Sequence, residues 1–216
     1  MIDFVTARRN MVEGQVRTAG VTDLRIQAAM LDVPREAFVP QAAAGLAYLD
    51  LDVPLGAGGR RLIKPMVLAK LMQAAEIAAS DRVLDVGCGS GYAAALLARL
   101  AAQVIALEED ASLAKAARGA LAGIGNVTVE AGSLTDGWPQ GAPYNAILIE
   151  GAVELVPAQL SGQLADGGRL VCILGPGPAA KAMLYRRSGD DMGARAIFDA
   201  AAPLLPGFVK PAEFAF

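Results

Sequence analysis

An aspartate and three glycines occupy alternate positions between Asp85 and Gly91, in the stretch VLDVGCGSGY. An apolar run precedes this DxGxGxG pattern and a helical pattern follows it, which is typical of a cofactor-binding turn at the end of a strand. In a doubly wound sheet, such a turn lies beside the ligand site. The sequence therefore predicts that a cofactor is surrounded by Asp85, Gly87, Cys88, Gly89, Ser90 and Gly91.

The residue types around this turn restrict the class of cofactor. A phosphate-binding loop requires GxxxxGK followed by serine or threonine, and the residues after Gly87 do not provide it. A dinucleotide turn requires a small residue where Tyr92 stands, which disfavours that class without excluding it. The carboxylate of Asp85 disfavours a pyrophosphate and suits an ammonium group. S-adenosylmethionine carries an ammonium group, and we predict it as the cofactor.

Glu108 is the next acidic residue that fits this chemistry. It ends the apolar run VIALE, about twenty residues after the turn, where a carboxylate accepts hydrogen bonds from ribose hydroxyls. Glu109 is the alternative if the register of the strand differs by one residue. A strand, the glycine pattern, a helix and a second strand that ends in glutamate together indicate the fold of class I methyltransferases.

Short apolar runs alternate with helical patterns from Arg82 onward. The runs have the length and composition of strands buried on both faces: VLDVG, QVIALE, NVTVEAG, YNAILIEG and GGRLVCILG. This alternation predicts an α/β fold with a doubly wound, Rossmann-like sheet that is mostly parallel. The later segments KAMLYRRS, GARAIFDA and PLLPGFV predict a hairpin or an antiparallel edge of that sheet.

The first 80 residues have a different pattern. DLRIQAAMLDV and PMVLAKLMQAAEIA show helical spacing, with Thr22 as a candidate N-cap and Pro65 in a first turn. Between them, LDVPLGAGGRRLIKP predicts a loop because it is rich in glycine and proline. We expect residues 1–80 to form an N-terminal helical section that covers the acceptor side of a cofactor-binding core, residues 81–216, in one compact unit.

The composition excludes several classes of protein. The 216 residues are 54% hydrophobic, which is enough for one large core. The net charge of −3 argues against a nucleic-acid partner, and we interpret the pairs Arg8-Arg9, Arg60-Arg61 and Arg186-Arg187 as ordinary surface charges. No apolar window is long enough for a membrane span, so we expect a cytoplasmic protein. Without histidine or a CxxC pair, neither a metal site nor a disulfide is expected.

Motifs along most of the chain resemble one family of methyltransferases. MVEGQVRTAGVTDLRIQAAMLDVPREAFVP and AYLDLDVPLGAGGRRLIKP are similar to the opening helices, the VPRE.FVP segment and the AY.D..LPIG.GQTIS.P stretch of the protein-L-isoaspartate O-methyltransferase family. VLDVGCGSGY, GWPQGAPYNAILIEGA and LSGQLADGGRLVCILG continue the resemblance. It implies methylation of the carboxylate of isoaspartyl residues in damaged proteins, with S-adenosylhomocysteine as the product and a protein or peptide as the partner.

The sequence departs from the family's pattern near the methyl-transfer site. Ile63 stands where the family has a serine or threonine hydroxyl, and Met66 stands where the family often has histidine. The family's GDG, whose aspartate contacts the adenine amino group, is Gly132-Ser133-Leu134 in this chain. The resemblance implies that Ile63, Lys64 and Met66 lie at the acceptor site, where Lys64 offers a cation to a carboxylate, and that Ser133 and Leu134 lie at the adenine.

A carboxylate acceptor suits a chain without histidine, because it is ionised near pH 7 and requires no general base. Transfer neutralises a sulfonium and a carboxylate, so a dry pocket formed by Leu62, Ile63 and Met66 favours it. The departures leave two alternatives open. One is a methyltransferase of the same fold with a different acceptor, and the other is a catalytically inactive paralogue that binds the cofactor to regulate a partner.

Overall fold

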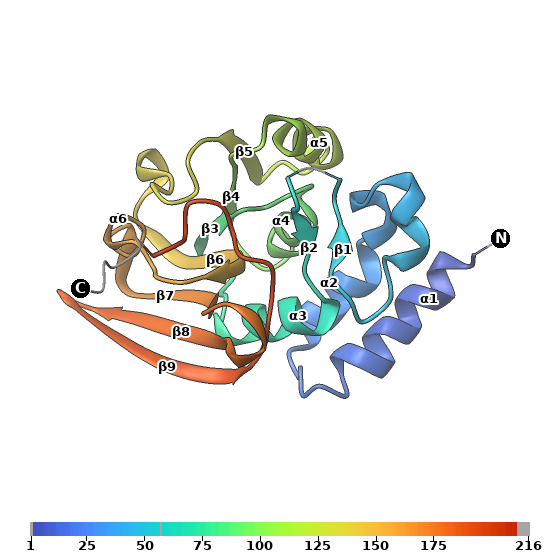
Figure 1. Cartoon of the computed structure of the whole chain (residues 1–216), viewed down its shortest axis with the longest axis horizontal. Helices are drawn as coiled ribbons and strands as arrows, with labels where there is room; N and C mark the ends of the chain where they lie inside the picture. Colours follow the sequence, from blue (N-terminus) through green and yellow to red (C-terminus); the bar gives the residue numbers. More distant parts are fainter. Residues whose placement is uncertain (1, 57, 211–216) are drawn as a thin grey trace, which may run out of the picture.

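The protein is described by a computed structural model that covers residues 2–56 and 58–210. Its α-helices are α1 (Phe4–Met11), α2 (Leu24–Asp32), α3 (Pro65–Ala74), α4 (Tyr92–Leu97), α5 (Ala111–Leu121) and α6 (Ala158–Ser161) (Figure 1). A π-helical turn, η1 (Val12–Val16), follows α1, and the 3-10 turns are η2 (Arg35–Phe38), η3 (Gln41–Leu46), η4 (Pro139–Gly141) and η5 (Gly177–Ala179). Within the described ranges, none of the helices has the length and apolar character needed to cross a membrane.

The central element is a sheet in the order β5-β4-β3-β6-β7-β8-β9. Its strands are β3 (Arg82–Val86), β4 (Gln103–Glu108), β5 (Val127–Ala131), β6 (Tyr144–Val153), β7 (Leu164–Leu174), β8 (Lys181–Ser188) and β9 (Asp191–Asp199). The pairs from β5 to β7 are parallel, whereas β7–β8 and β8–β9 are antiparallel. The predicted doubly wound sheet with an antiparallel C-terminal edge is confirmed.

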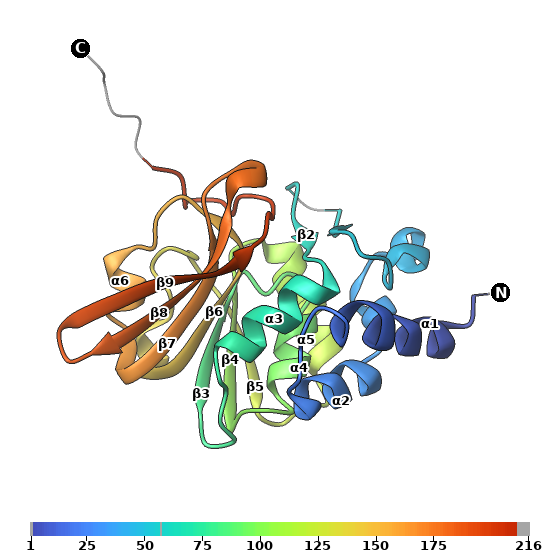
Figure 2. The same ribbon diagram turned by 90° about the horizontal axis from the view of Figure 1, so that it is seen from below.

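Alternate residues of the central strands enter two separate hydrophobic clusters. On β3, Val83 belongs to the cluster that contains side chains of α1 to α5, whereas Leu84 belongs to the cluster that contains Leu160 of α6 and the C-terminal Phe208. Figure 2 shows α1 to α5 gathered on one side of the sheet. The continuous apolar character of these strands follows from this burial on both faces.

Two local predictions need correction. The N-cap of α2 is Asp23, whose carboxylate accepts from Arg25 N, and not Thr22. The predicted loop between α2 and α3 contains a short antiparallel pair, β1 (Val53–Pro54) with β2 (Arg61–Leu62). An aspartate caps a helix at least as well as a threonine, which explains why the helix begins after Asp23 and not after Thr22.

The C-terminal segment PLLPGFV forms no regular strand in the structure. Its contact with the sheet is an isolated bridge between Leu204 and Ala152 of β6. The backbone N–H of Leu205 donates to Ala152 O at 2.9 Å, and that of Glu154 donates to Phe208 O at 2.9 Å. In Figure 1 this segment, in red, runs along the carboxyl end of β6. Two prolines and a glycine in PLLPGFV limit longer pairing.

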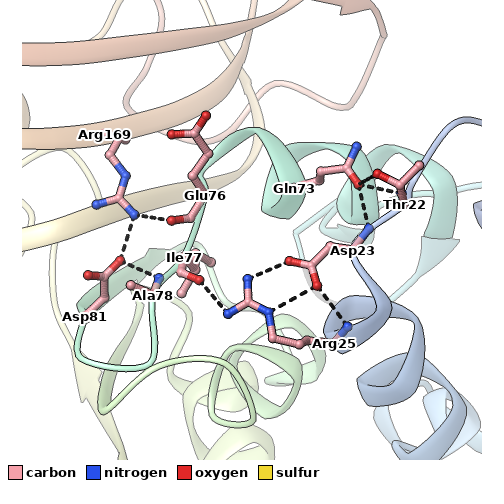
Figure 3. Close-up of polar contacts among 9 residues, drawn as sticks. All are labelled: Thr22, Asp23, Arg25, Gln73, Glu76, Ile77, Ala78, Asp81 and Arg169. Carbon is pink, nitrogen blue, oxygen red and sulfur yellow. Dashed lines mark hydrogen bonds and ion pairs between the residues drawn. The ribbon is translucent and has the colours of Figure 1, made fainter.

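Polar contacts attach α2 to α3 (Figure 3). Gln73 Oε1 accepts from the backbone N–H groups of Thr22 and Asp23, at 2.6 and 3.0 Å. Arg25 Nη1 donates to Ile77 O at 3.1 Å, while its other nitrogens donate to the Asp23 carboxylate. These contacts fix the N-terminal helices relative to the helix that leads into β3.

Arg169 of β7 attaches the end of α3 to the sheet. Its guanidinium donates to the carbonyl oxygens of Ala75, Glu76 and Asn145 at 2.6–2.9 Å. It also pairs with the Asp81 carboxylate at 2.7 Å, and Figure 3 shows its contacts with Glu76 and Asp81. The side chain of Arg169 is 11% exposed and that of Asp81 is 7% exposed. Because this pair is shielded from water, removal of one partner leaves the other groups unsatisfied.

The Arg169→Met substitution should therefore lower the free energy of unfolding by about 3–5 kcal/mol. Arg186→Met is the matched control, because Arg186 pairs with Glu76 in a salt bridge whose side chains are 51% and 61% exposed, and its loss should cost less than about 1 kcal/mol. Urea denaturation of both variants measures the difference. Equal effects would contradict a structural role of Arg169.

Candidate functional site

The turn after β3 has a backbone conformation that favours glycine. Gly87, Gly89 and Gly91 have φ angles of 76°, 56° and 95°, which side chains rarely tolerate. A Cβ atom at Gly89 would lie 2.8 Å from Leu55 Cδ1, and one at Gly91 would lie 2.7 Å from Leu121 Cδ1. The pattern of glycines is thus required both by the backbone and by the side chains that pack on it.

Glu108 is completely buried at the end of β4. Its Oε2 accepts from Gly89 N at 2.7 Å, so the structure brings the glycine turn and this carboxylate together. Its Oε1 accepts from the backbone N–H groups of Glu109 and Asp110, at 3.0 Å each, directly before α5. The Glu109 side chain is exposed, so the carboxylate that faces the turn is that of Glu108.

Arg60 enters the same site from the residue before β2. Its Nη1 pairs with Glu108 Oε1 at 2.5 Å, and its Nη2 donates to Gly87 O at 2.8 Å. The side chains of Arg60 and Glu108 are 6% and 0% exposed. The interpretation of Arg60 as a surface charge is therefore wrong: Arg60 is a buried cation above the glycine turn, while its neighbour Arg61 is exposed.

Two further carboxyl groups lie on the same face of the sheet. Asp85 of β3 and Glu150 of β6 are 0% and 4% exposed. In the registers of the sheet, Val86 pairs with both Leu107 and Ile149, so Glu108 and Glu150 flank the residue after Val86. Strand periodicity directs Asp85, Glu108 and Glu150 to one face, where α1 to α5 pack.

The carboxyl groups of Asp85 and Glu150 lie beside each other. Burial, together with the nearby Glu108 charge, raises the pKa of Asp85 to about 7. Burial and the Asp85 carboxylate raise the pKa of Glu150 well above its usual range. Asp85 Oδ1 and Oδ2 and Glu150 Oε1 have no hydrogen-bond partner among the described residues. Buried oxygen atoms without partners are costly, and they point to a ligand or a shared proton.

Two apolar side chains cover the site. Leu55 lies over Gly89, and Leu205 from the C-terminal segment lies over Gly87 and Gly151. A Cβ atom added at Gly151 would come within 2.6 Å of Leu205 Cγ, and one at Gly87 within 3.3 Å of Leu205 Cδ1. Beside Glu150 remains a cavity of about 20 Å³, lined also by Gly58, Gly59, Arg60, Arg61, Pro203, Leu204 and Leu205. This is room for about one water molecule.

Arg35 positions the chain that leads to the predicted acceptor residues. Its guanidinium is fully buried and donates to Ala47 O at 2.8 Å and to Ile63 O at 2.7 Å. The guanidinium also lies over the ring of Tyr92, 4.8 Å from its centroid. Arg35 therefore connects the residue after η3, the residue after β2 and the start of α4.

The predicted acceptor residues lie in different environments. Ile63 is 1% exposed and packs in the core next to α1 to α5, and Met66 is partly buried against the same cluster. Lys64 is half-buried, and its backbone N–H donates to Asp52 Oδ1 at 2.9 Å. A groove of about 410 Å³ includes Lys64 and is also lined by Asp50, Leu51, Asp52, Arg61, Ala201, Ala202 and Pro203.

The other predicted cofactor residues surround the turn or follow β5. Cys88 is buried, and Ser90 Oγ donates to Phe38 O of η2. Ser133 is exposed and its Oγ lies 3.0 Å from Thr135 Oγ1, whereas Leu134 is fully buried. In the described ranges, no group of three or more cysteine, aspartate or glutamate side chains is arranged to hold a metal ion.

Sequence reasoning missed four residues of this site: Arg35, Arg60, Glu150 and Leu205. Glu150 interrupts the apolar run AILIEGAV, and an acidic residue at the end of a buried strand is a detectable signal. Arg60 follows the glycine-rich stretch GAGG, and no comparable pattern in the sequence indicates that its side chain is buried. The contact of Leu205 with Gly87 depends on the path of the C-terminal segment, which the sequence does not reveal.

The arrangement of these groups fits a nucleoside that also carries an ammonium group. Glu108 lies at the position for ribose hydroxyls, at the end of the second strand. The unpartnered oxygen atoms of Asp85 fit an ammonium donor. Arg60 pairs with the Glu108 carboxylate at this position.

Comparison with known proteins identifies the family. The family described as protein-L-isoaspartate(D-aspartate) O-methyltransferase matches residues 7–199. The chain belongs to this family. A protein-L-isoaspartate O-methyltransferase of Methylorubrum extorquens is 43% identical over 190 residues, which cover 88% of this chain and 83% of that protein. The isoaspartyl methyltransferase resemblance of the sequence motifs is thereby confirmed.

Solved structures with this fold include isoaspartyl methyltransferases. One protein-L-isoaspartate O-methyltransferase has a TM-score of 0.80 and 24% identity, and the match covers 93% of this chain and 66% of that chain. A putative protein-L-isoaspartate O-methyltransferase from Plasmodium falciparum, in complex with S-adenosyl-L-homocysteine, has a TM-score of 0.74 and 18% identity, with 94% and 97% of the two chains covered. At these identities the likeness shows a common fold.

The buried ion pair of this family member provides a test of the site. Arg60→Ala should lower the free energy of unfolding by about 3–5 kcal/mol, because it leaves the Glu108 carboxylate buried without its cation. The control Arg61→Ala removes an exposed side chain and should change stability by less than about 0.5 kcal/mol. Urea denaturation of both variants without ligand checks this. An Arg60 variant as stable as the Arg61 variant would show that the ion pair is unimportant for stability.

Proposed function

We propose that this protein is an S-adenosylmethionine-dependent methyltransferase that methylates the carboxylate of isoaspartyl residues in proteins or peptides. The observation that supports this proposal most directly is the buried carboxylate of Glu108 at the glycine turn. Its Oε2 lies 2.7 Å from Gly89 N, in a chain of this family. The names of the relatives favour an isoaspartyl acceptor over the alternatives of another acceptor or an inactive paralogue. The proposal includes a cytoplasmic location.

The proposed cofactor site uses the ends of the first two parallel strands. Glu108 accepts hydrogen bonds from the ribose hydroxyls, and Asp85 binds the ammonium group. The residues Gly87, Cys88, Gly89, Ser90 and Gly91 surround the middle of the cofactor, and Ser133 and Leu134 lie toward the adenine. The Plasmodium falciparum structure in complex with S-adenosyl-L-homocysteine supports this choice of cofactor. Arg60 must leave Glu108 for the ribose to bind, since its Nη1 occupies Oε1 of that carboxylate.

When bound, the cofactor supplies a methyl group on a sulfonium. The chain's residues then have to align an acceptor carboxylate with the S–CH₃ bond and exclude water. An ionised carboxylate needs no residue to remove a proton, which agrees with a chain that contains no histidine. The side chains of Leu62, Ile63 and Met66 keep this side of the site apolar.

The acceptor is proposed to approach along the groove that contains Lys64 and Arg61. These cations would attract an anionic isoaspartyl segment, although Asp50 and Asp52 line the same groove and limit its positive charge. Residues 1–80 would thus form the acceptor side, with residues 81–216 as the cofactor-binding core.

The decisive experiment is transfer of a labelled methyl group from S-adenosylmethionine to two matched peptides, one with isoaspartate and one with aspartate. We expect label on the isoaspartyl peptide alone, because orientation of that carboxylate governs the rate. A Glu108→Ala variant serves as the control for background transfer. Cofactor binding with no transfer to the isoaspartyl peptide would contradict the proposed acceptor.

Substitution of Glu108 by glutamine tests the ribose contact. It should weaken S-adenosylhomocysteine binding about 10–100-fold, because hydrogen bonds to a charged acceptor are lost. Glu109→Gln is the matched control, since this neighbouring side chain is exposed, and it should change the affinity less than about twofold. Calorimetric titration measures both. Equal affinities of the two variants would remove Glu108 from the cofactor site.

A further inference from the structure

The carboxyl group of Glu150 is unexplained by the functions assigned so far. It lies in the carboxyl-terminal half of β6, is 4% exposed and faces Asp85 of the adjacent strand. The sequence analysis assigned no role to Glu150. Among the described residues, no hydrogen bond joins it to the predicted acceptor residue Ile63. A buried carboxyl group at the switch point of a doubly wound sheet is a strong indication of a ligand contact.

Three oxygen atoms of this pair face the interior without a hydrogen-bond partner in the described part of the chain. They are Asp85 Oδ1, Asp85 Oδ2 and Glu150 Oε1. The nearby cation, Arg60, already uses Nη1 for Glu108 and Nη2 for Gly87 O. Two adjacent buried carboxylates repel each other strongly, so one proton has to be held between them when no other cation is present.

An ammonium group matches this arrangement of acceptors. It has three N–H donors and no acceptor, so it can satisfy three oxygen atoms at once. It also supplies the positive charge that allows both carboxyl groups to be ionised. Glu108 lies on the other side of β3 from Glu150, which leaves the ribose contact undisturbed.

We propose that Glu150 and Asp85 together form the binding site of the cofactor's ammonium group, and that they release their shared proton to solvent when this group binds. The inference rests on the proposed function, because it requires S-adenosylmethionine or its product as the ligand. It adds Glu150 to the cofactor site as a binding residue, and it couples cofactor binding to pH. Below the pKa of the pair, the affinity should fall up to about tenfold for each pH unit.

The raised pKa of Asp85 and Glu150 supports this geometry, since burial is the main cause for both groups. Other charged or titratable groups also act on the pair and belong to the same electrostatic cluster: Arg60 before β2, Glu108 of β4, Cys88 after β3 and Arg35 of η2. A substitution at Glu150 leaves each of these side chains in place, so its direct chemical change is confined to the pair.

The test is calorimetric titration of the full chain with S-adenosylhomocysteine near pH 7, in two buffers with different ionisation enthalpies. The wild type should release about one proton for each ligand bound, whereas Glu150→Gln should release almost none. The variant's affinity should also fall about tenfold or more, because an amide replaces a charged acceptor. Glu109→Gln, with its exposed side chain, is the control and should behave as wild type.

A second ligand separates the ammonium contact from the rest of the site. 5′-Methylthioadenosine has the nucleoside and the thioether but no amino-acid portion. It should bind to the wild type and to Glu150→Gln with affinities that agree within about twofold, and without proton release. Loss of its binding in the variant would show that Glu150 acts through the fold and would overturn the proposal.

Other results of the titration also decide the question. Equal proton release from the wild type and Glu150→Gln, or none from either despite binding, would overturn the role of the pair. Absence of any S-adenosylhomocysteine binding to the folded wild type would overturn the proposed function together with this inference. Asp85→Asn is the second variant, and it should abolish proton release in the same way.

The pH dependence of stability without ligand tests the shared proton independently. A carboxyl group with a raised pKa binds its proton more tightly in the folded chain than in the unfolded chain. Its contribution to stability is full below the usual aspartate pKa and is lost as the pH rises through about 7. The Tm of the wild type minus that of Glu150→Gln should therefore decrease between about pH 5 and about pH 8. A constant difference would contradict the shared proton.

Discussion

The burial of three carboxyl groups on one face of the sheet is the constraint on which the site depends. Asp85, Glu108 and Glu150 are each less than 5% exposed, because the carboxyl ends of β3, β4 and β6 lie under the covering loops. Charges in this position require a cation, hydrogen-bond donors or protonation. The ion pair of Arg60 with Glu108 meets part of this requirement, and the backbone N–H groups near the glycine turn meet another part.

Several parts of the structure hold these carboxyl groups and Arg60 in position. The short pair of β1 with β2 sets the position of Arg60, and the Leu55 N–H donates to Arg60 O at 3.0 Å. Arg35 binds the carbonyl of Ile63 directly after β2. The N-terminal section is held in turn by the Arg169 cluster at the opposite ends of the strands. The cluster of charges and its cover are thus one cooperative unit, in which a change at one group alters the protonation of the others.

Much of the fold and part of the site could be predicted from the sequence. Strands buried on both faces produce the apolar runs around Asp85 and Glu108, and the glycine pattern follows from φ angles that other residues avoid. The same local signals do not describe contacts between distant segments. Arg60 resembles a surface residue because its neighbour is also arginine, and its burial depends on Glu108, which lies in a different part of the chain. Thr22 and Asp23 are both good caps, so sequence alone did not separate them.

The path of the C-terminal segment has a consequence for how the site forms during synthesis. Leu205 covers Gly87, and its backbone N–H binds Ala152 of β6. Every strand of the parallel sheet precedes this residue in the chain. A nascent chain can therefore complete the sheet while the side of the cluster at Gly87 and Glu150 still faces water, and hydration lowers the free-energy cost of the Glu150 carboxyl group until then. Desolvation of this side of the cluster then becomes a late step in folding, and it coincides with closure of the site by the last described segment.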